Sequence, residues 1–324
     1  MTENNINPTA GLEEIRTIAS CNICEAVGRT GIGGRKENQD SYNGVRIGET
    51  VVLTVCDGMG GMNGGQTASR IAVAEIVQTM NETPEEEISA DTVRLAVENA
   101  NAAIYRRAMN EPQLRGMGTT ATVVVLSPKA AYITHIGDSR IYLLHKGKKE
   151  FRTFDHSKVF EMVEQGMISE EQARQSSFSN IITRALGIRP QVEMTVEILP
   201  YRKGDRFILC CDGIWNAKPE PEMIKLFNEC KTAIDEVKVL TETINAYGME
   251  IGGEHDNLTA IVADIKCNSK MQHSCFKLVG RALGRQWQRI RGTCKKKNKY
   301  IRANKYGETH NNRQRNGLRH YNPR

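Results

Sequence analysis

Residues 120–154, TATVVVLSPKAAYITHIGDSRIYLLHKGKKEFRTF, decide the fold class. Two apolar runs, 120–126 and 131–136, are separated by only four residues, and the run 141–146 passes through Gly147 into 148–154. Connections this short join antiparallel strands, whereas parallel strands need a crossover of a dozen or more residues. The stretch therefore predicts antiparallel hairpins and argues against a doubly wound parallel sheet.

Helical patterns flank the strands. Residues 66–80 place apolar and small side chains on one face, and Ser89 is a candidate N-cap for a second helix with its own apolar face. Further helical regions are predicted over 158–175, broken at Gly166, and from Pro219 to about Gly248. Hairpins with helices on their faces predict an α+β layered architecture around one continuous core.

Four acidic residues stand where apolar strands end or begin: Asp57 after VVLTVC, Asp138 after AYITHIG, Asp212 after RFILCC and Asp256 before LTAIVADI. One such Asp is usually a turn residue. Several carboxylates in one cleft repel each other unless hard cations neutralise them, and oxygen ligands favour Mg, Mn or Ca over Zn. The repeated pattern therefore predicts a metal site.

The other potential metal ligands show no comparable pattern. The seven His are scattered, and Cys21 with Cys24 forms one CxxC without a second pair, so these two cysteines are expected to be core residues. Nine Cys, an odd number, and the absence of a charged-then-apolar leader predict reduced thiols and a cytoplasmic location. The apolar runs are far shorter than the ~18 residues of a membrane span.

The net charge of +6 averages two unlike segments. Residues 268–324 contain 16 Lys+Arg and one acid, Glu308, which is +15. The remaining 28 basic and 37 acidic residues give −9 upstream. This asymmetry predicts a boundary near Cys267. Residues 1–25 are then a lead-in, 26–267 the main domain and 268–324 a basic tail.

Eight motifs follow one another along the main domain: GGRKENQDSY, CDGMGG, MGTTAT, HIGDSR, DHS, NIITRALG, CCDGIW and DNLTAIV. In order and spacing they resemble the metal-dependent protein phosphatases, the protein phosphatase 2C family, in its compact bacterial form. The resemblance spans about Val27 to Ile265. Each motif alone is a weak signal, but eight in sequence are specific.

The resemblance implies a four-layer sandwich of two antiparallel β-sheets flanked by α-helices, with two Mn²⁺ or Mg²⁺ ions at one end. It implies hydrolysis of phosphoserine and phosphothreonine by a metal-bridging water, in opposition to a bacterial serine/threonine kinase. The implied ligands are Asp57 as the bridge, the Gly58 carbonyl, Asp212, Asp256 and, through water, Asp40. Asp138, near Thr120, matches the position of a third ion, and Gln39 and Asn257 are candidate supporting residues.

Arg35, five residues before Asp40, is the candidate phosphate clamp, because a planar guanidinium can hold two phosphate oxygens at once. The alternative is a surface ion pair with Glu37. Met59 stands where many eukaryotic relatives have a proton-donating His. The general acid therefore stays open, with His156 a weak candidate whose loop is equally explained by packing. His255 is expected to face solvent.

The stretch 158–180 corresponds to the variable flap of the family, and its SSFSN segment departs from related chains, so substrate preference does not transfer. In the tail, Phe276, Val279, Leu283, Trp287 and Ile290 share one face of a predicted basic amphipathic helix over 275–291. This helix could contact an acidic membrane surface, nucleic acid or the acidic domain, or could simply pack on the domain.

The main prediction is a monomeric protein-serine/threonine phosphatase acting on phosphoproteins. Two other readings stay open. A catalytically silent phosphatase fold could act as a binding module through its basic tail, although such relatives typically lose a metal carboxylate and Asp40, Asp57, Asp212 and Asp256 are all present. A metal-dependent nuclease would use the same ions, but the motif order matches phosphatases.

Overall fold

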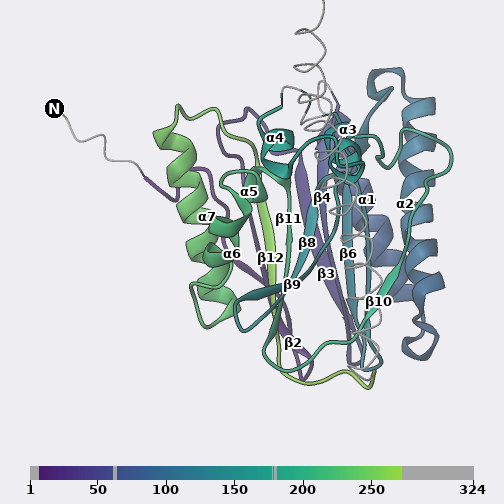
Figure 1. Cartoon of the computed structure of the whole chain (residues 1–324). Helices are drawn as coiled ribbons and strands as arrows, with labels where there is room; N and C mark the ends of the chain where they lie inside the picture. The colour runs from purple at the N-terminus through teal and green to yellow at the C-terminus, as the bar shows by residue number, and fades with distance from the viewer. Residues whose placement is uncertain (1–6, 61–63, 177, 179–180, 272–324) are drawn as a thin grey trace, which may run out of the picture.

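The fold is a four-layer sandwich in which two antiparallel sheets lie between two layers of helices (Figure 1). A computed structural model of the chain describes residues 7–60, 64–176, 178 and 181–271. One sheet has the order β1-β2-β12-β11-β8-β9 and the other the order β10-β7-β6-β4-β3. This architecture confirms the predicted α+β class.

The first sheet consists of β1 (Arg16–Ser20), β2 (Cys24–Gly31), β12 (Leu258–Ile265), β11 (Asp205–Cys210), β8 (Arg140–His145) and β9 (Lys148–Arg152). The second consists of β10 (Glu197–Leu199), β7 (Ala131–Ile136), β6 (Ala121–Leu126), β4 (Thr50–Met59) and β3 (Asp40–Ile47), and the short β5 (Gly118–Thr119) pairs with β4. The β6–β7 and β8–β9 hairpins are antiparallel, as their short connections predicted.

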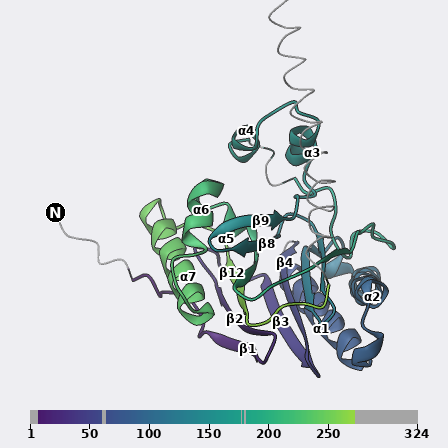
Figure 2. The ribbon, with the colours of Figure 1, turned by 60° about the horizontal axis from the view of Figure 1, so that its bottom comes forward.

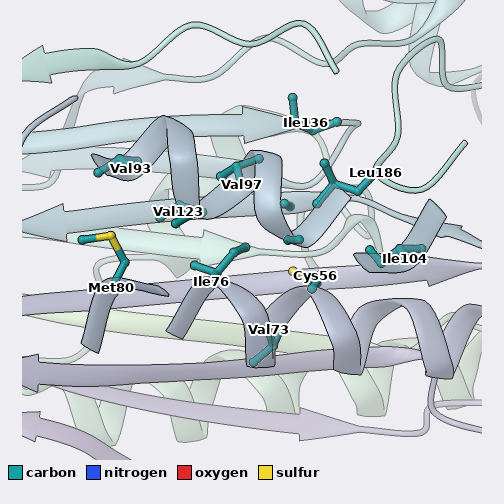
Figure 3. Close-up of a cluster of buried hydrophobic side chains, with 14 of the residues drawn as sticks. Cys56, Val73, Ile76, Met80, Val93, Val97, Ile104, Val123, Ile136 and Leu186 are labelled. Atoms are coloured by element: carbon teal, nitrogen blue, oxygen red, sulfur yellow. The ribbon is translucent and has the colours of Figure 1, made fainter. Parts of the chain in front are cut away.

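Two long helices, α1 (Gly64–Glu82) and α2 (Ala90–Asn110), cover the outer face of the second sheet. Ile76 and Met80 of α1 and Val97 and Ile104 of α2 belong to one buried cluster with the sheet residue Val123 (Figure 3). The apolar stripe of each helix faces this cluster because helical residues three and four apart share a face. Ser89 caps α2 through a capping box with Thr92, as predicted.

The first sheet is covered by α5 (Asp212–Trp215), α6 (Glu220–Leu226) and α7 (Ala233–Glu250). The prediction of one helical region from Pro219 to Gly248 was wrong, because the chain leaves the helical path after Phe227 and α7 begins anew at Thr232. The Thr232 hydroxyl accepts a hydrogen bond from the backbone N–H of Asp235, which satisfies one of the free donors at the new helix start.

A third buried cluster fills the space between the two sheets, with Leu53, Val124, Phe207 and Ile261 fully buried in it. Both sheets therefore present one face to a shared core and the other to helices, so their strands are apolar on both faces. The first strand, β1, and the start of β2 pair within the first sheet although they lie in the segment treated as a lead-in.

Two short helices, α3 (Lys158–Glu164) and α4 (Glu170–Arg174), stand away from the sandwich at one end of the sheets (Figure 2). They are separated around Gly166, which has φ +68°, in agreement with the predicted break. Two short 3-10 turns complete the described elements, Glu85–Glu87 and Pro112–Leu114. None of the helices in the described ranges is long and apolar enough to cross a membrane. The predicted tail helix, 275–291, lies outside the described residues.

Candidate active site

Strand ends from both sheets meet in one pocket. In the second sheet, the last residues of β4 and the turn after β7 supply Asp57 and Asp138. In the first sheet, the start of α5 after β11 supplies Asp212, and the loop before β12 supplies Asp256. The pocket has a volume of about 490 Å³ and is lined by Arg35, Lys36, Glu37, Gln39, Asp57, Gly58, Met59, Thr120, Asp138, Ile182, Asp212, Asp256 and Asn257.

Asp40 lies directly behind this pocket. It pairs with Asp57 across the β3–β4 ladder and is 7% exposed. It contributes instead to the wall of a neighbouring cavity of about 650 Å³ between α1, β3 and the residues before β1. The sequence analysis expects Asp40 to reach the ions through water, and in the structure Asp40 does not line the pocket itself.

The carboxylates raise one another's pKa. Burial, followed by the charges of Asp40 and Asp212, raises the pKa of Asp57 well above its usual range. Burial raises the pKa of Asp40 to about 7, and burial with the charge of Asp256 raises that of Asp212 to about 6. Burial, followed by the charge of Asp212, also raises the pKa of Asp138 well above its usual range. Desolvation and like charges both disfavour the ionised forms, and a bound cation would favour them.

The donor set fits a hard divalent ion. Both carboxylate oxygens of Asp40 and the Oδ1 atom of Asp212 are buried and have no hydrogen-bond partner among the residues that the structure describes. Buried unpaired carboxylate oxygens are costly, and Mg²⁺ or Mn²⁺ would satisfy them as oxygen ligands. Among the described residues, no three Asp, Glu, His or Cys side chains form a tight ligand cluster. The fit therefore rests on the unpartnered oxygens, not on a preformed coordination shell.

Backbone contacts fix the strand that carries Asp57. The backbone N–H of Asp57 donates to the Thr120 hydroxyl at 2.9 Å, and the Thr120 N–H donates to the Asp57 carbonyl at 2.8 Å. A Cβ atom on Gly58 would lie 2.1 Å from the carbonyl oxygen of Gly65, so only glycine fits there. The hydroxyl and the N–H of Thr120 thus fix the backbone of Asp57. The absence of a side chain at Gly58 allows α1 to begin close beside the site.

Arg35 binds Asp256 with two hydrogen bonds, from Nε to Oδ1 at 2.9 Å and from Nη2 to Oδ2 at 2.7 Å. The alternative pairing with Glu37 is not formed; Glu37 instead contacts the amide of Gln39. The Arg35 side chain is 54% exposed. It therefore stands at the pocket mouth, where a guanidinium could turn from a carboxylate to the similar oxygens of a phosphate.

Asn257 holds the loop that carries Arg35. Its Nδ2 group donates to the carbonyls of Ile32 and Glu37 at 2.8 and 3.0 Å, and its Oδ1 accepts from the backbone N–H of Gln39 at 2.9 Å. The backbone carbonyl of Gln39 in turn accepts from the N–H of Gly58. Asn257 and Gln39 therefore position the entry loop against β4 and β12.

The two histidines singled out from the sequence both pack within the domain. His255 was expected to face solvent, but its Nε2 lies 2.8 Å from Asn245 Oδ1 on α7, and burial lowers its pKa. His156 stacks on His135 with ring centroids 4.4 Å apart, and its Nδ1 accepts from the Gly137 N–H at 3.3 Å. Burial lowers the pKa of His156 to about 3. A ring that is neutral at pH 7 is a poor general acid.

The depressed pKa of His156 predicts acid sensitivity. The unfolded histidine takes up a proton below its usual pKa of about 6.5, whereas the folded one does so only near 3. The contribution of His156 to the free energy of unfolding is therefore fully present above pH 6.5. Below that pH it falls by up to about 1.4 kcal/mol per pH unit. We expect His156→Gln to lose less stability than the wild type between pH 7 and 4.5 in urea unfolding with EDTA. Equal slopes would contradict this account.

Sequence reasoning missed a buried support behind the pocket. Arg140 in HIGDSR makes two 2.7 Å hydrogen bonds to Asp155 of the DHS motif, and both side chains are almost fully buried. The Arg140 guanidinium also lies 3.3 Å from the ring centre of Trp215, whose Nε1 donates to the Asp138 carbonyl at 2.9 Å. The sequence signal for this pair was an Arg in HIGDSR and an Asp in DHS, two of the eight motifs.

The protein phosphatase 2C model matches residues 27–250. The chain belongs to the protein phosphatase 2C family. The serine/threonine phosphatase stp of Listeria monocytogenes is 34% identical over 236 residues, which cover 72% of this chain and 88% of that protein. The family assignment made from the eight motifs is thus confirmed.

Solved structures of the family have the same fold. Stp1 from Staphylococcus aureus is 26% identical with a TM-score of 0.67, covering 77% of this chain and 97% of that chain. The catalytic domain of PstP, solved in complex with two manganese ions, is 30% identical with a TM-score of 0.62, covering 75% of this chain and 98% of that chain. The two-sheet sandwich and its helices match these phosphatase structures.

Proposed function

We propose that this protein is a Mn²⁺- or Mg²⁺-dependent phosphoprotein phosphatase that hydrolyses phosphoserine and phosphothreonine. The observation that carries the proposal is the pocket itself, where four strand-end carboxylates and Arg35 line one cavity and Asp40 lies behind it. Family membership and the manganese-bound relative support the same chemistry. Among the described residues that line the pocket, Arg35 and Lys36 are the basic side chains, against five acidic ones.

Each residue has a distinct role in the proposed reaction. Two ions would be held by Asp57, Asp212, Asp256 and the Gly58 carbonyl. Asp40, which lies behind the pocket, would contact these ions through water. When bound, such ions lower the pKa of water and neutralise phosphate oxygens. Arg35 orients the phosphate by a two-point contact. The position of Asp57 is fixed by Thr120, and that of the loop carrying Arg35 by Asn257 and Gln39. Asp138 is the proposed ligand of a third ion.

The direct test is phosphate release from p-nitrophenyl phosphate and from a phosphothreonine peptide. We expect turnover with Mn²⁺, less or equal turnover with Mg²⁺, and none with EDTA. The full chain should be compared with a variant ending at Cys267, because equal rates would make residues 268–324 dispensable for chemistry. Turnover that persists in EDTA would contradict the proposed ion dependence.

Several finer features belong to the same proposal. A serine/threonine kinase would supply the phosphoproteins, and the protein would act as a monomer in the cytoplasm. The unit 26–267 would form the phosphatase domain, with the first sheet completed by β1 from the lead-in. The basic tail would direct the enzyme to an acidic membrane surface or to nucleic acid, a choice that sedimentation with anionic vesicles and with RNA would distinguish.

The two rival readings predict different results. A silent binding module would release no phosphate with any metal, although the described site retains Asp40, Asp57, Asp212 and Asp256 around the pocket. A nuclease would cleave plasmid DNA or total RNA in the presence of Mn²⁺. The motif order and the phosphatase relatives favour the phosphatase over both.

A further inference from the structure

A smaller cavity of about 250 Å³ adjoins the carboxylate pocket. Arg35, Asp212 and Asp256 line both cavities, so the two hollows are neighbours that share the Arg35–Asp256 ion pair. The rest of the smaller cavity comes from the residues after α5 and from the last turns of α7. A molecule held at the phosphate clamp would therefore lie beside this cavity.

The wall away from the ion pair is mostly apolar, with Asn216 and His255 as its polar side chains. Ile244 is buried, Ala217 and Tyr247 are partly buried, and Ile251 is 65% exposed, so the cavity runs from the core to the surface. The Lys218 ammonium lies 3.9 Å from the centre of the Tyr247 ring. This cation–π contact orients the aromatic ring in the wall.

His255 forms one side of the cavity, beside α7. A Cβ atom on Gly248 would lie 2.2 Å from the His255 ring, so glycine at this position lets the ring pack directly on α7. The His255 Nε2 atom lies 2.8 Å from Asn245 Oδ1, and this contact holds the ring against the helix. The cavity therefore combines a mostly apolar wall with Asp212 and Asp256 on the side facing the phosphate site.

We propose that this cavity binds an apolar side chain of the substrate, such as Leu, Met or Phe, within two residues of the phosphorylated residue. The proposal rests on the phosphatase function proposed above. A peptide advances about 3.3–3.6 Å per residue, which limits the reach from Arg35 to near neighbours. An apolar side chain would bury surface against Ala217, Tyr247 and Ile251, whereas an acidic one would lose its hydration against that apolar wall.

The test uses phosphothreonine peptides in an alanine background, with Leu, Asp or Ala at each of the two positions before and after the phosphothreonine. We expect Leu at one position to raise kcat/KM about 10-fold over Ala, and Asp there to lower it, as apolar pockets discriminate side chains by roughly this factor. Equal values for Leu and Ala at all four positions would overturn the proposal.

Two substitutions assign the preference to this cavity. Ala217→Leu fills it and Ile251→Ser removes its exposed apolar side, and each should reduce the Leu-to-Ala ratio towards 1. The ratio is taken within one variant, so a general change in activity or folding cancels. Ile198→Ser is the matched control, since Ile198 is an isoleucine of β10 that is 40% exposed away from both cavities. It should keep the wild-type ratio.

The outcomes separate this proposal from the proposed function. If the wild type releases phosphate from neither p-nitrophenyl phosphate nor any peptide with Mn²⁺, the phosphatase function fails. If it releases phosphate but the Leu preference survives both Ala217→Leu and Ile251→Ser, the phosphatase function stands and the apolar subsite is wrong.

Discussion

Asp57→Asn should reduce kcat/KM for a phosphothreonine peptide about 1000-fold, which corresponds to about 4 kcal/mol of lost transition-state stabilisation. The amide keeps the shape of the side chain but removes the charge that faces Asp40 and Asp212. Asp212→Asn should have an effect of similar size. Steady-state rates with Mn²⁺ give the measurement, and activity that survives both substitutions would refute the proposed site.

The same Asp57→Asn variant should be more stable than the wild type when metal is withheld. Asp57 is desolvated beside other carboxylates, and one fewer like charge relieves their repulsion. Urea unfolding in EDTA should therefore show a higher midpoint for the variant. Asp91→Asn, an exposed acid in the first turn of α2, is the control for loss of one negative charge and should change neither activity nor midpoint substantially. A lower urea midpoint for Asp57→Asn than for the wild type in EDTA would contradict this prediction.

Arg140→Met should lower the free energy of unfolding by about 3–5 kcal/mol, because it leaves the Asp155 carboxylate buried without its partner. Arg140 supplies both hydrogen bonds to that carboxylate, and the two side chains are 4% and 2% exposed. Urea unfolding monitored by tryptophan fluorescence in a Trp287→Phe background would measure the loss and report on Trp215, the ring that Arg140 contacts.

Two further variants test whether the loss comes from the unpaired charge. Arg140→Met with Asp155→Leu removes both charges and should recover a large part of the stability. Arg46→Met breaks an exposed pair with Glu49 at 3.4 Å and should cost less than about 1 kcal/mol. If the double variant is as unstable as the sum of two single losses, the buried pair is not the cause.

The elements of the fold were predictable where local pattern decides them. The four-residue link between 126 and 131 permits little except a hairpin, and Ser89 marks the start of α2 because its hydroxyl can cap a helix. The break between α6 and α7 was missed because apolar spacing continues across it. That break depends on a single cap at Thr232, a signal easily hidden inside a long helical pattern.

The sequence predicted which residues belong to the candidate site, but not which of their side chains contact one another. The strand-end position of Asp57 and Asp256 is visible in the sequence, and both line the pocket. The contact between Arg35 and Asp256 joins residues 221 positions apart, and the Arg140–Asp155 pair joins the first residue of β8 to the loop after β9. Local patterns carry no information about such side-chain partners, so the position of His255 was also wrongly assigned.

The division of the pocket between the two sheets has a thermodynamic consequence. Asp57 and Asp138 extend from one sheet, whereas Asp212 and Asp256 extend from the other. An ion that binds residues from both sheets binds only the assembled sandwich, so its binding free energy adds to folding by about 2.7 kcal/mol at a concentration 100 times Kd. Removal of such an ion would then lower the stability of the sandwich as well as the rate of the reaction.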